Sequence, residues 1–559
     1  MPLDLLAAYW YSLRCLRPEQ ILGRLHYRLA WQLYPRFPSL ARLACGRAAL
    51  SARPRPGFSC PPRPVPRTVV SPAEPIDWNP PNTPLLARFH LHYFDWAAAA
   101  EPALLARQVE NWIRSNPPGA WPGWHPYPTS LRIVNWIRAF SSTLAPAPNM
   151  VASLATQAAF LAANLEFHLG GNHLLENARA LLAAGLYFDG ASAARWKTTG
   201  LHLLRREFTA QILPDGGHFE RSPWYHASMT ALVEDSIHLL AANGCEVPPE
   251  LVSAAARMTR FYRALRHPDG RLPLFHDALD TETSDPPAAG GLVSFPASGY
   301  YILDTAHGRL IADYGAPADC YNPAHQHAGI FSFEASGGPR RVVTDFGTPT
   351  YEPGPARDRL RSTAAHNTVC VDGRDQFQVW AAFRVGRRAR VGPVEERRQP
   401  QFHFLSAAHD GYHHLGVEHR RSIVSIPDAG WLIVDDLAGR GSHRLESFVH
   451  LAPGITPEIR AGRVCLLPLG WILLPFGFAA PPVITADTYS PAIEVIEPSQ
   501  TLVLSAGPQL PCRFGYFLGP GASGLVWDGV NTLRLETPHR DITVRLKSSD
   551  SDSIEVSYN

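Results

Sequence analysis

Three short segments of this sequence gather side chains that bind anions or move protons. The first, residues 172–177 (NHLLEN), follows the pair Gly170-Gly171. If a helix begins there, an amide, an imidazole and a carboxylate converge near its N-terminus, where backbone N–H groups favour negative charge. The segment therefore predicts an anion-binding site at Asn172, His173 and Glu176. A capped helix, with Asn172 as the N-cap and the other two side chains solvated or bonded locally, explains it equally well.

The second segment, residues 215–226 (DGGHFERSPWYH), begins with a glycine-rich turn, and charged and aromatic residues come directly after that turn. Trp224 could stack on a sugar ring, and Arg221 could bind the hydroxyl groups of that ring. Tyr225 could donate or accept a proton. A packed tyrosine that has a hydrogen-bond partner for structural reasons is the alternative.

The third segment begins with residues 325–327 (HQH) and continues through Asp345, Arg361 and His366. On a strand, residues 325 and 327 would point to the same side. Asp345 and His366 lie in or beside neighbouring expected strands, so imidazoles and a carboxylate can meet on one face. Two histidines and one carboxylate suit Zn²⁺ or a similar divalent ion. A hydrogen-bonded cluster without metal is the alternative.

Arg132 stands in the helical stretch 130–138 (SLRIVNWIR). Its guanidinium group could bind a substrate carboxylate through two parallel hydrogen bonds. A side chain that lies along an apolar surface, or that pairs with an acidic neighbour, explains it equally well.

The elements that must position these residues change along the chain. Residues 1–84 comprise an arginine-rich helical pattern followed by a proline-rich linker from residue 54 to residue 84. Residues 85–290 hold Ala- and Leu-rich stretches broken by Gly and Pro, which predicts an array of helices. Residues 291–559 predict an antiparallel β-sandwich, because no helical crossovers separate the short β-branched runs at 329–335, 341–346, 368–371, 422–426 and 431–435.

The amino-acid composition indicates which kinds of molecule the protein is expected to bind. The chain has 559 residues, of which 45% are hydrophobic and 18% charged, with a formal net charge of +2. We expect at least two globular domains and no general affinity for nucleic acid. The eight cysteines form no CxxC pair, which argues against a disulfide framework. We expect no transmembrane segment, because no stretch approaches the roughly 20 apolar residues that cross a bilayer.

Five motifs, in this order, resemble the heparinase II/III family of polysaccharide lyases. They are NHLLEN at 172–177, FERSPWYH at 219–226, HQHAGIFSFE at 325–334, VTDFG at 343–347 and LRSTAAHNTVCVDG at 360–373. The resemblance spans most of the chain. It implies an N-terminal (α/α) toroid followed by a C-terminal antiparallel β-sandwich, and β-elimination of a uronic-acid-containing glycan. An anionic polysaccharide is then the expected substrate, and a homodimer is one option for assembly.

The resemblance also implies roles for single residues. Asn172 matches a residue that neutralises the uronate carboxylate, and Tyr225 matches the tyrosine that acts on the glycosidic oxygen. His173 and His325 match active-site histidines, either of which is the alternative base to Tyr225. Glu176 matches an acid that contacts substrate. Further substrate contacts are expected at Arg132, Arg221, Trp224 and Arg361.

A structural zinc ion is also implied, because the family binds one through two histidines and an aspartate. The matching positions are His327, Asp345 and His366. This sequence departs from the family pattern at Gly329, where many members carry aspartate. Family enzymes are commonly exported, which favours the periplasm or cell envelope. Residues 5–13 are not followed by a small-residue cleavage site, however, so the N-terminus favours the cytoplasm.

Two other functions fit the same residues. A glycoside hydrolase on a helical toroid would use two carboxylates, chosen among Asp215, Glu220 and Glu176, as acid and base. A non-catalytic glycan-binding protein of exopolysaccharide production would bind a glycan without turnover. A lyase leaves an unsaturated, ultraviolet-absorbing uronate, whereas a hydrolase leaves a saturated product.

Overall fold

The chain divides into two compact units. A computed structural model describes residues 3–45, 53–60, 72–281, 287, 290–317, 320–546 and 554–558. The helical unit comprises residues 16–212 and 228–258, and the β unit comprises the remaining residues, Met1–Cys15, Leu213–Ala227 and Thr259–Asn559. This division differs from the expected boundaries at residues 84 and 290. The segment that carries Tyr225 belongs to the β unit, although it lies between helices in the sequence.

Prolines mark the beginning of many helices. A proline ring presets φ for a helix, and its missing N–H is not needed at the first helical position. The proline content therefore reflects helix starts as well as the linker, of which residues 61–71 lie outside the described residues. The helices are α1 (Leu3–Leu13), α2 (Pro18–Leu33), α3 (Pro38–Ala44), α4 (Leu85–Leu91), α5 (Pro102–Ser115), α6 (Pro126–Ser142), α7 (Pro148–Ala163), α8 (Gly171–Tyr187), α9 (Ala191–Gln211), α10 (Pro223–Ala242), α11 (Pro249–Ala264) and α12 (Pro355–Arg361).

The helical unit packs around α8, which is buried along almost its whole length. Its core joins buried tryptophans of α5 and α6 to leucines of α8 and α9. Gly200 of α9 lets that helix approach α8, because a Cβ there would fall 2.5 Å from the backbone nitrogen of Leu182. None of the described helices is long and apolar enough to span a membrane.

The strands of the β unit pair antiparallel. In the part of the chain that the structure describes, an eight-stranded sheet has the order β11 (Glu395–Gln399), β12 (Phe402–His409), β13 (Val417–Ile426), β14 (Gly430–Gly439), β21 (Cys512–Gly519), β18 (Trp471–Phe476), β17 (Arg463–Leu467), β16 (Thr456–Arg460). A nine-stranded sheet has the order β19 (Val483–Tyr489), β20 (Glu497–Ser505), β15 (Leu445–Leu451), β7 (Arg340–Val343), β6 (Phe333–Gly337), β5 (Gly308–Asp313), β4 (Tyr300–Thr305), β3 (Leu292–Phe295), with β8 (Val369–Val371) paired to β15.

Smaller sheets complete the set. A four-stranded sheet is formed by β22 (Gly524–Trp527), β23 (Thr532–Glu536), β24 (Ile542–Leu546) and β25 (Ile554–Tyr558). Two-stranded pairs are formed by β1 (Arg53–Pro54) with β2 (Phe188–Asp189), in the helical unit, and by β9 (Val379–Trp380) with β10 (Arg384–Val385).

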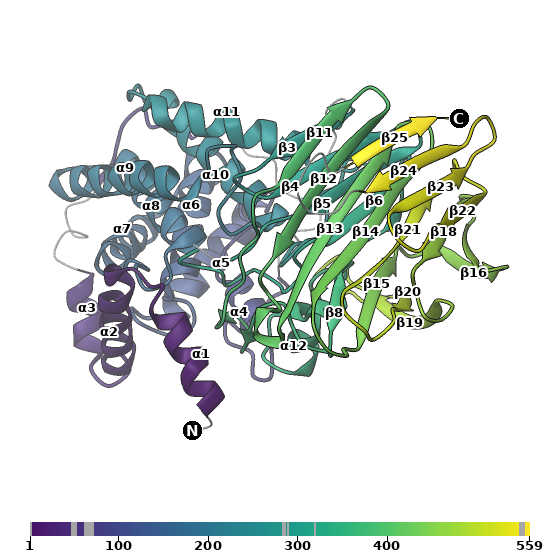
Figure 1. Ribbon diagram of the computed structural model, residues 1–559. Coiled ribbons are helices and arrows are strands. Elements are labelled where there is room, and N and C mark those ends of the chain that lie inside the picture. The colour runs from purple at the N-terminus through teal and green to yellow at the C-terminus, as the bar shows by residue number, and fades with distance from the viewer. Residues whose placement is uncertain are drawn as a thin grey trace. The chain divides into compact units, whose positions relative to one another are not determined.

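The central strands of the eight-stranded sheet are buried on both faces, and its long strands β12, β13 and β14 run side by side (Figure 1). On β13, Ile423 packs toward the nine-stranded sheet, whereas its neighbour Val424 packs toward the four-stranded sheet. Successive side chains of a strand point to opposite faces, so this sheet needs nearly continuous apolar runs. The predicted fold, an (α/α) toroid followed by an antiparallel β-sandwich, is confirmed, with the four-stranded sheet as an additional layer.

Because α8 and α9 are in close contact, we expect a single added methyl group between them to lower the stability of the protein. Gly200→Ala should lower the free energy of unfolding by about 1–3 kcal/mol, because the new Cβ would meet helix backbone rather than a movable side chain. Thermal unfolding followed by helical circular dichroism measures the change. Gly507→Ala is the matched control, because a Cβ there meets nothing within 4 Å. Equal stability of both variants would contradict the prediction.

Candidate functional site

The N-terminus of α8 carries the first predicted cluster. Gly170 and Gly171 have positive φ values of 66° and 54°, which glycine adopts without strain, and the helix begins at Gly171. Asn172 is therefore inside the first turn, and Gly170, not Asn172, is the N-cap. The side-chain oxygen of Asn172 is buried and accepts no hydrogen bond from the described residues. A buried amide oxygen without a partner is costly unless a ligand or water satisfies it.

His173 is oriented by a carboxylate that the sequence motifs do not include. Its Nδ1 lies 3.0 Å from Oε1 of Glu166, which is fully buried. Asn177 donates to the other oxygen of Glu166 at 2.9 Å. Because an ionised carboxylate only accepts hydrogen bonds, Nδ1 of His173 carries the proton and Nε2 is the basic nitrogen. The side chain of His173 is 27% exposed, so that basic nitrogen belongs to a ring that solvent reaches.

Glu176 is fixed by an ion-pair chain within the helical unit. Arg179, one turn along α8, lies 2.6 Å from Glu176 and 2.9 Å from Asp235. Asp235 also pairs with Arg138. Glu176 is thus a buried carboxylate held in place beside Asn172 and His173, as the prediction of one cluster requires.

In the β unit, Tyr225 and His325 lie against each other. Their rings stack with centroids 3.8 Å apart and an angle of 24° between the planes. Tyr225 stands in the first turn of α10, and its hydroxyl lies 3.3 Å from that of Tyr351. The sequence predicts that Tyr225 and His325 act on one sugar, and within the β unit the structure brings these two residues together.

A buried carboxylate, Asp277, holds His325 in this position. One Asp277 oxygen accepts from Nδ1 of His325 at 2.9 Å, and the other accepts from Nε2 of His327 at 2.9 Å. Arg357 binds both oxygens, one of them at 2.7 Å. Burial alone would raise the pKa of Asp277, but the charge and hydrogen bonds of Arg357, with the two histidines, hold it well below its ordinary value. His325 is therefore held as the tautomer whose Nε2 is basic.

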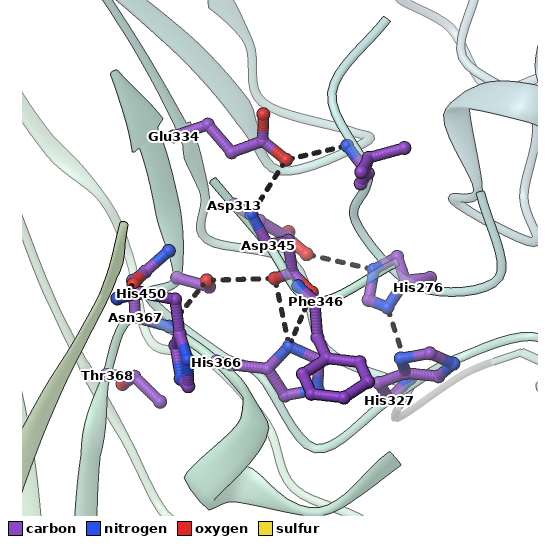
Figure 2. Close-up of polar contacts among 12 residues, drawn as sticks. His276, Asp313, His327, Glu334, Asp345, Phe346, His366, Asn367, Thr368 and His450 are labelled. Atoms are coloured by element: carbon purple, nitrogen blue, oxygen red, sulfur yellow. Dashed lines mark hydrogen bonds and ion pairs between the residues drawn. The ribbon is translucent and has the colours of Figure 1, made fainter. Parts of the chain in front are cut away.

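The segment from 325 to 327 is a turn rather than the strand that the sequence predicts. The two imidazoles nevertheless converge, because both bind the same carboxylate, Asp277. His366 follows a 3₁₀ turn and its Nδ1 lies 2.9 Å from Asp345, just after β7 (Figure 2). Gly329 allows this packing, since a Cβ there would fall 2.7 Å from the ring of His366. The aspartate that many family members carry at this position would not fit without movement of that ring.

The described residues hold no group of three His, Cys, Asp or Glu side chains arranged around one metal position. Two donors nevertheless suit a metal. Nδ1 of His327 and Nε2 of His366 are buried and make no hydrogen bond to any residue that the structure describes, and the two ring centroids are 5.4 Å apart. Burial lowers the pKa of His327 well below its ordinary value, so that ring is neutral, as metal binding requires. Asp345 is engaged by Nδ1 of His366 (Figure 2).

Two arginines expected to bind substrate have structural positions instead. Arg132 is fully buried, stacks over Trp112 at 3.9 Å, and donates to Gln157, Thr129 and the carbonyl of His92. Arg361 is also buried, and it donates to the carbonyls of Ala381 and Gln326. Neither guanidinium group is presented to solvent, so the expected substrate contacts are corrected to packing contacts. A buried arginine without an acidic partner needs such carbonyl and amide acceptors.

The other expected substrate contacts stay predictions. Trp224 is half-buried and packs on a small apolar cluster that contains Leu274 and Tyr489. Arg221 is half-buried and has a positive φ of 64°. Its carbonyl accepts a hydrogen bond from Tyr300 at 2.6 Å.

The carboxylates that a hydrolase would need are placed for other tasks. Asp215 accepts from both the backbone N–H and the hydroxyl of Ser298 at 2.7 Å, so it connects two loops of the β unit. Glu220 is fully buried, accepts from Asn322 at 2.8 Å, and lies 4.0 Å from Nε2 of His325. Glu220 thus adds negative charge beside His325.

Because of the histidines around Glu166, we expect the helical unit to lose stability in acid. Burial lowers the pKa values of His125 and His168 from 6.5 to about 4, so the unfolded chain binds their protons first and stability falls below pH 6.5. Burial would raise the pKa of Glu166, but His173 and its neighbours lower it from 4.5 to about 2, so further stability is lost below pH 4.5.

Urea unfolding at a series of pH values measures this loss. Glu166→Gln should remove the part below pH 4.5 and cost on the order of 3 kcal/mol at neutral pH. Glu246→Gln, at an exposed position of the same unit, should change neither. If the free energy of unfolding of the parent stays constant between pH 7 and pH 4, the lowered pKa values of His125 and His168 are contradicted.

Comparisons with known proteins agree with the fold and the motifs. The family models "Heparinase II/III N-terminus" and "Heparinase II/III-like, C-terminal" match residues 99–297 and 287–508. A heparin-sulfate lyase of Bacteroides stercoris is 24% identical over 59% of this chain and 54% of its own length. FtsZ-localized protein C of Caulobacter vibrioides is 27% identical over 68% of this chain and 73% of its own length.

The chain thus spans little more than half the length of the lyases it matches. The crystal structure of a heparinase III superposes with a TM-score of 0.67 at 17% identity, covering 85% of each chain. This likeness establishes the fold of both units. Together the two family models cover most of the sequence, and the five motifs lie within them. The chain belongs to the heparinase II/III family.

Proposed function

We propose that this protein is a polysaccharide lyase that cleaves a uronic-acid-containing glycan by β-elimination. The observation that carries the proposal is the stacked pair of Tyr225 and His325, with His325 held as one tautomer by Asp277. A phenol beside an imidazole of fixed tautomer can exchange a proton with a bound sugar. The relatives named heparin-sulfate lyase, from Bacteroides stercoris and Bacteroides thetaiotaomicron, support the same reaction class.

Each residue has a distinct task in this proposal. Elimination removes the proton at C5, which is weakly acidic until the adjacent carboxylate is neutralised. The side-chain NH2 group of Asn172 donates hydrogen bonds to that carboxylate. Nε2 of His173 or of His325 accepts the C5 proton, and the hydroxyl of Tyr225 donates to the departing O4. Glu176, oriented by Arg179, binds a sugar hydroxyl.

A hydrolase is less favoured by the same geometry. Asp215 is engaged by Ser298, and Glu220 is buried and bonded to Asn322. The substrate class that we propose is an anionic uronate polymer, with heparan sulfate, alginate and a bacterial exopolysaccharide as the members to test. A homodimer stays a prediction.

The reaction predicts a specific effect of one hydroxyl. With a panel of uronate polymers, the parent should release an ultraviolet-absorbing unsaturated product, and Tyr225→Phe should lower kcat/KM by about a hundredfold or more. Tyr187→Phe is the control, because Tyr187 ends α8 opposite the Asn172 end.

Two outcomes would contradict the proposal that the protein is a lyase. New reducing ends without ultraviolet absorbance would indicate the hydrolase. Equal glycan binding by parent and Tyr225→Phe, with no turnover by either on any polymer, would indicate a binding protein. Circular dichroism of each variant confirms that a loss of activity is not a loss of fold.

We also propose a structural zinc ion held by His327, Asp345 and His366. The two imidazole nitrogens that make no hydrogen bond to the described residues support it. Asp345 accepts from Nδ1 of His366, on the other side of that ring, so it would have to release Nδ1 and move to the Nε2 side to join them. The ion would crosslink the turn at residues 325–327 to the segments that follow β7 and precede β8. The ion would stabilise the fold and take no part in the reaction, since it would have three protein ligands and no reacting group.

Metal content can be measured without any substrate. Elemental analysis of protein purified without added ions should find about one zinc per chain. His366→Ala should lose the metal and unfold at a lower temperature, whereas His413→Ala, at an exposed histidine, should retain both. A parent without stoichiometric metal, together with an unchanged unfolding temperature in His366→Ala, would contradict the proposal.

A further inference from the structure

Helix α2 shows an apolar face to solvent, which is the reverse of the usual pattern for a surface helix. Leu22, Leu25 and Leu29 are 67%, 58% and 59% exposed, and Ile21 is 49% exposed. At 100° per residue these four side chains fall within one arc of about 100°. The opposite face, which includes Ala30, is the one that packs on the helical unit.

Helix α3 of the same unit, with the residue before it, shows the same inverted pattern. Phe37, Leu40 and Leu43 are 53%, 37% and 75% exposed. The side chain that α3 buries is Ala41, so this short helix also has its small residue inside and its large ones outside. Single exposed leucines are ordinary, but seven large apolar side chains exposed within 23 residues of sequence mark an interaction surface. We call the exposed residues of α2 and α3 the α2–α3 face.

The charges along the segment that carries the α2–α3 face are mostly positive. From residue 17 to residue 42 the sequence has arginine at 17, 24, 28, 36 and 42, no lysine or aspartate, and one glutamate, Glu19. Arg206 lies 3.2 Å from Glu19 and offsets its charge. Arg28, Arg36 and Arg42 are exposed. The net charge of +2 for the whole chain hides this local excess.

From this combination we propose that the α2–α3 face binds an anionic lipid surface, with its leucines among the acyl chains and its arginines at the headgroups. Amphipathic helices with large apolar side chains and arginine at the edge bind membranes in this way. A second copy of the chain is disfavoured as the occupant, because it would bring arginines against arginines. An anionic glycan would need the arginines but would leave the leucines in water.

Vesicle sedimentation of the full-length protein tests the proposal. The parent should bind vesicles made of equal parts phosphatidylglycerol and phosphatidylcholine, and bind pure phosphatidylcholine much more weakly. Leu22→Gln combined with Leu25→Gln should lower the partition coefficient by about tenfold or more. Arg28→Glu should weaken binding chiefly at low salt, because headgroup attraction is screened. Ile496→Gln combined with Val526→Gln is the matched control at exposed apolar positions of the β unit.

The outcomes separate the possible occupants. Absence of sedimentation with anionic vesicles would overturn the proposal, as would equal binding by the parent and the leucine variant. A parent that is dimeric without vesicles and becomes monomeric on the leucine substitutions would instead make a second copy the occupant. Retention on an anionic glycan column that the leucine variant shares, with no vesicle binding, would identify a glycan surface. Lyase activity enters none of these measurements.

Discussion

The part of the β unit that holds Tyr225 and His325 depends on one buried carboxylate. Asp277 binds Arg357 through both oxygens and accepts a hydrogen bond from each of His325 and His327. Removing one partner from such a buried group leaves an uncompensated charge, which costs several kcal/mol. The same carboxylate sets the tautomers of both histidines. Stability and chemistry therefore rest on the same atoms at this position.

The helical unit repeats this arrangement with different residues. Glu166 is buried, binds Asn177, and holds Nδ1 of His173, as Asp277 holds Nδ1 of His325. In each unit a histidine that resembles an active-site residue gains its basic Nε2 from a carboxylate outside its own motif. The family relationship and the geometry thus lead to the same histidines by independent routes.

Much of the fold could be predicted from the sequence, because helical and strand periodicities are local. The motif residues could be found because each motif lies within one short stretch of sequence. Glu166 and Asp277 could not, since a lone acidic residue in a loop has no periodic signal and its partner lies 7 or 48 residues away. Arg132 was misjudged because the sequence does not reveal burial: its acceptors are carbonyl and amide oxygens, which leave no acidic signature.

The order in which the chain visits its units has an evolutionary consequence. It passes from the β unit to the helical unit and back again twice, after residues 15, 212, 227 and 258. Neither unit is thus encoded by one uninterrupted stretch, so a break in the gene at any point between residues 17 and 257 would separate parts of both units. Exchange of either unit between related genes would therefore require several crossovers, whereas point substitutions and loop insertions leave both units whole.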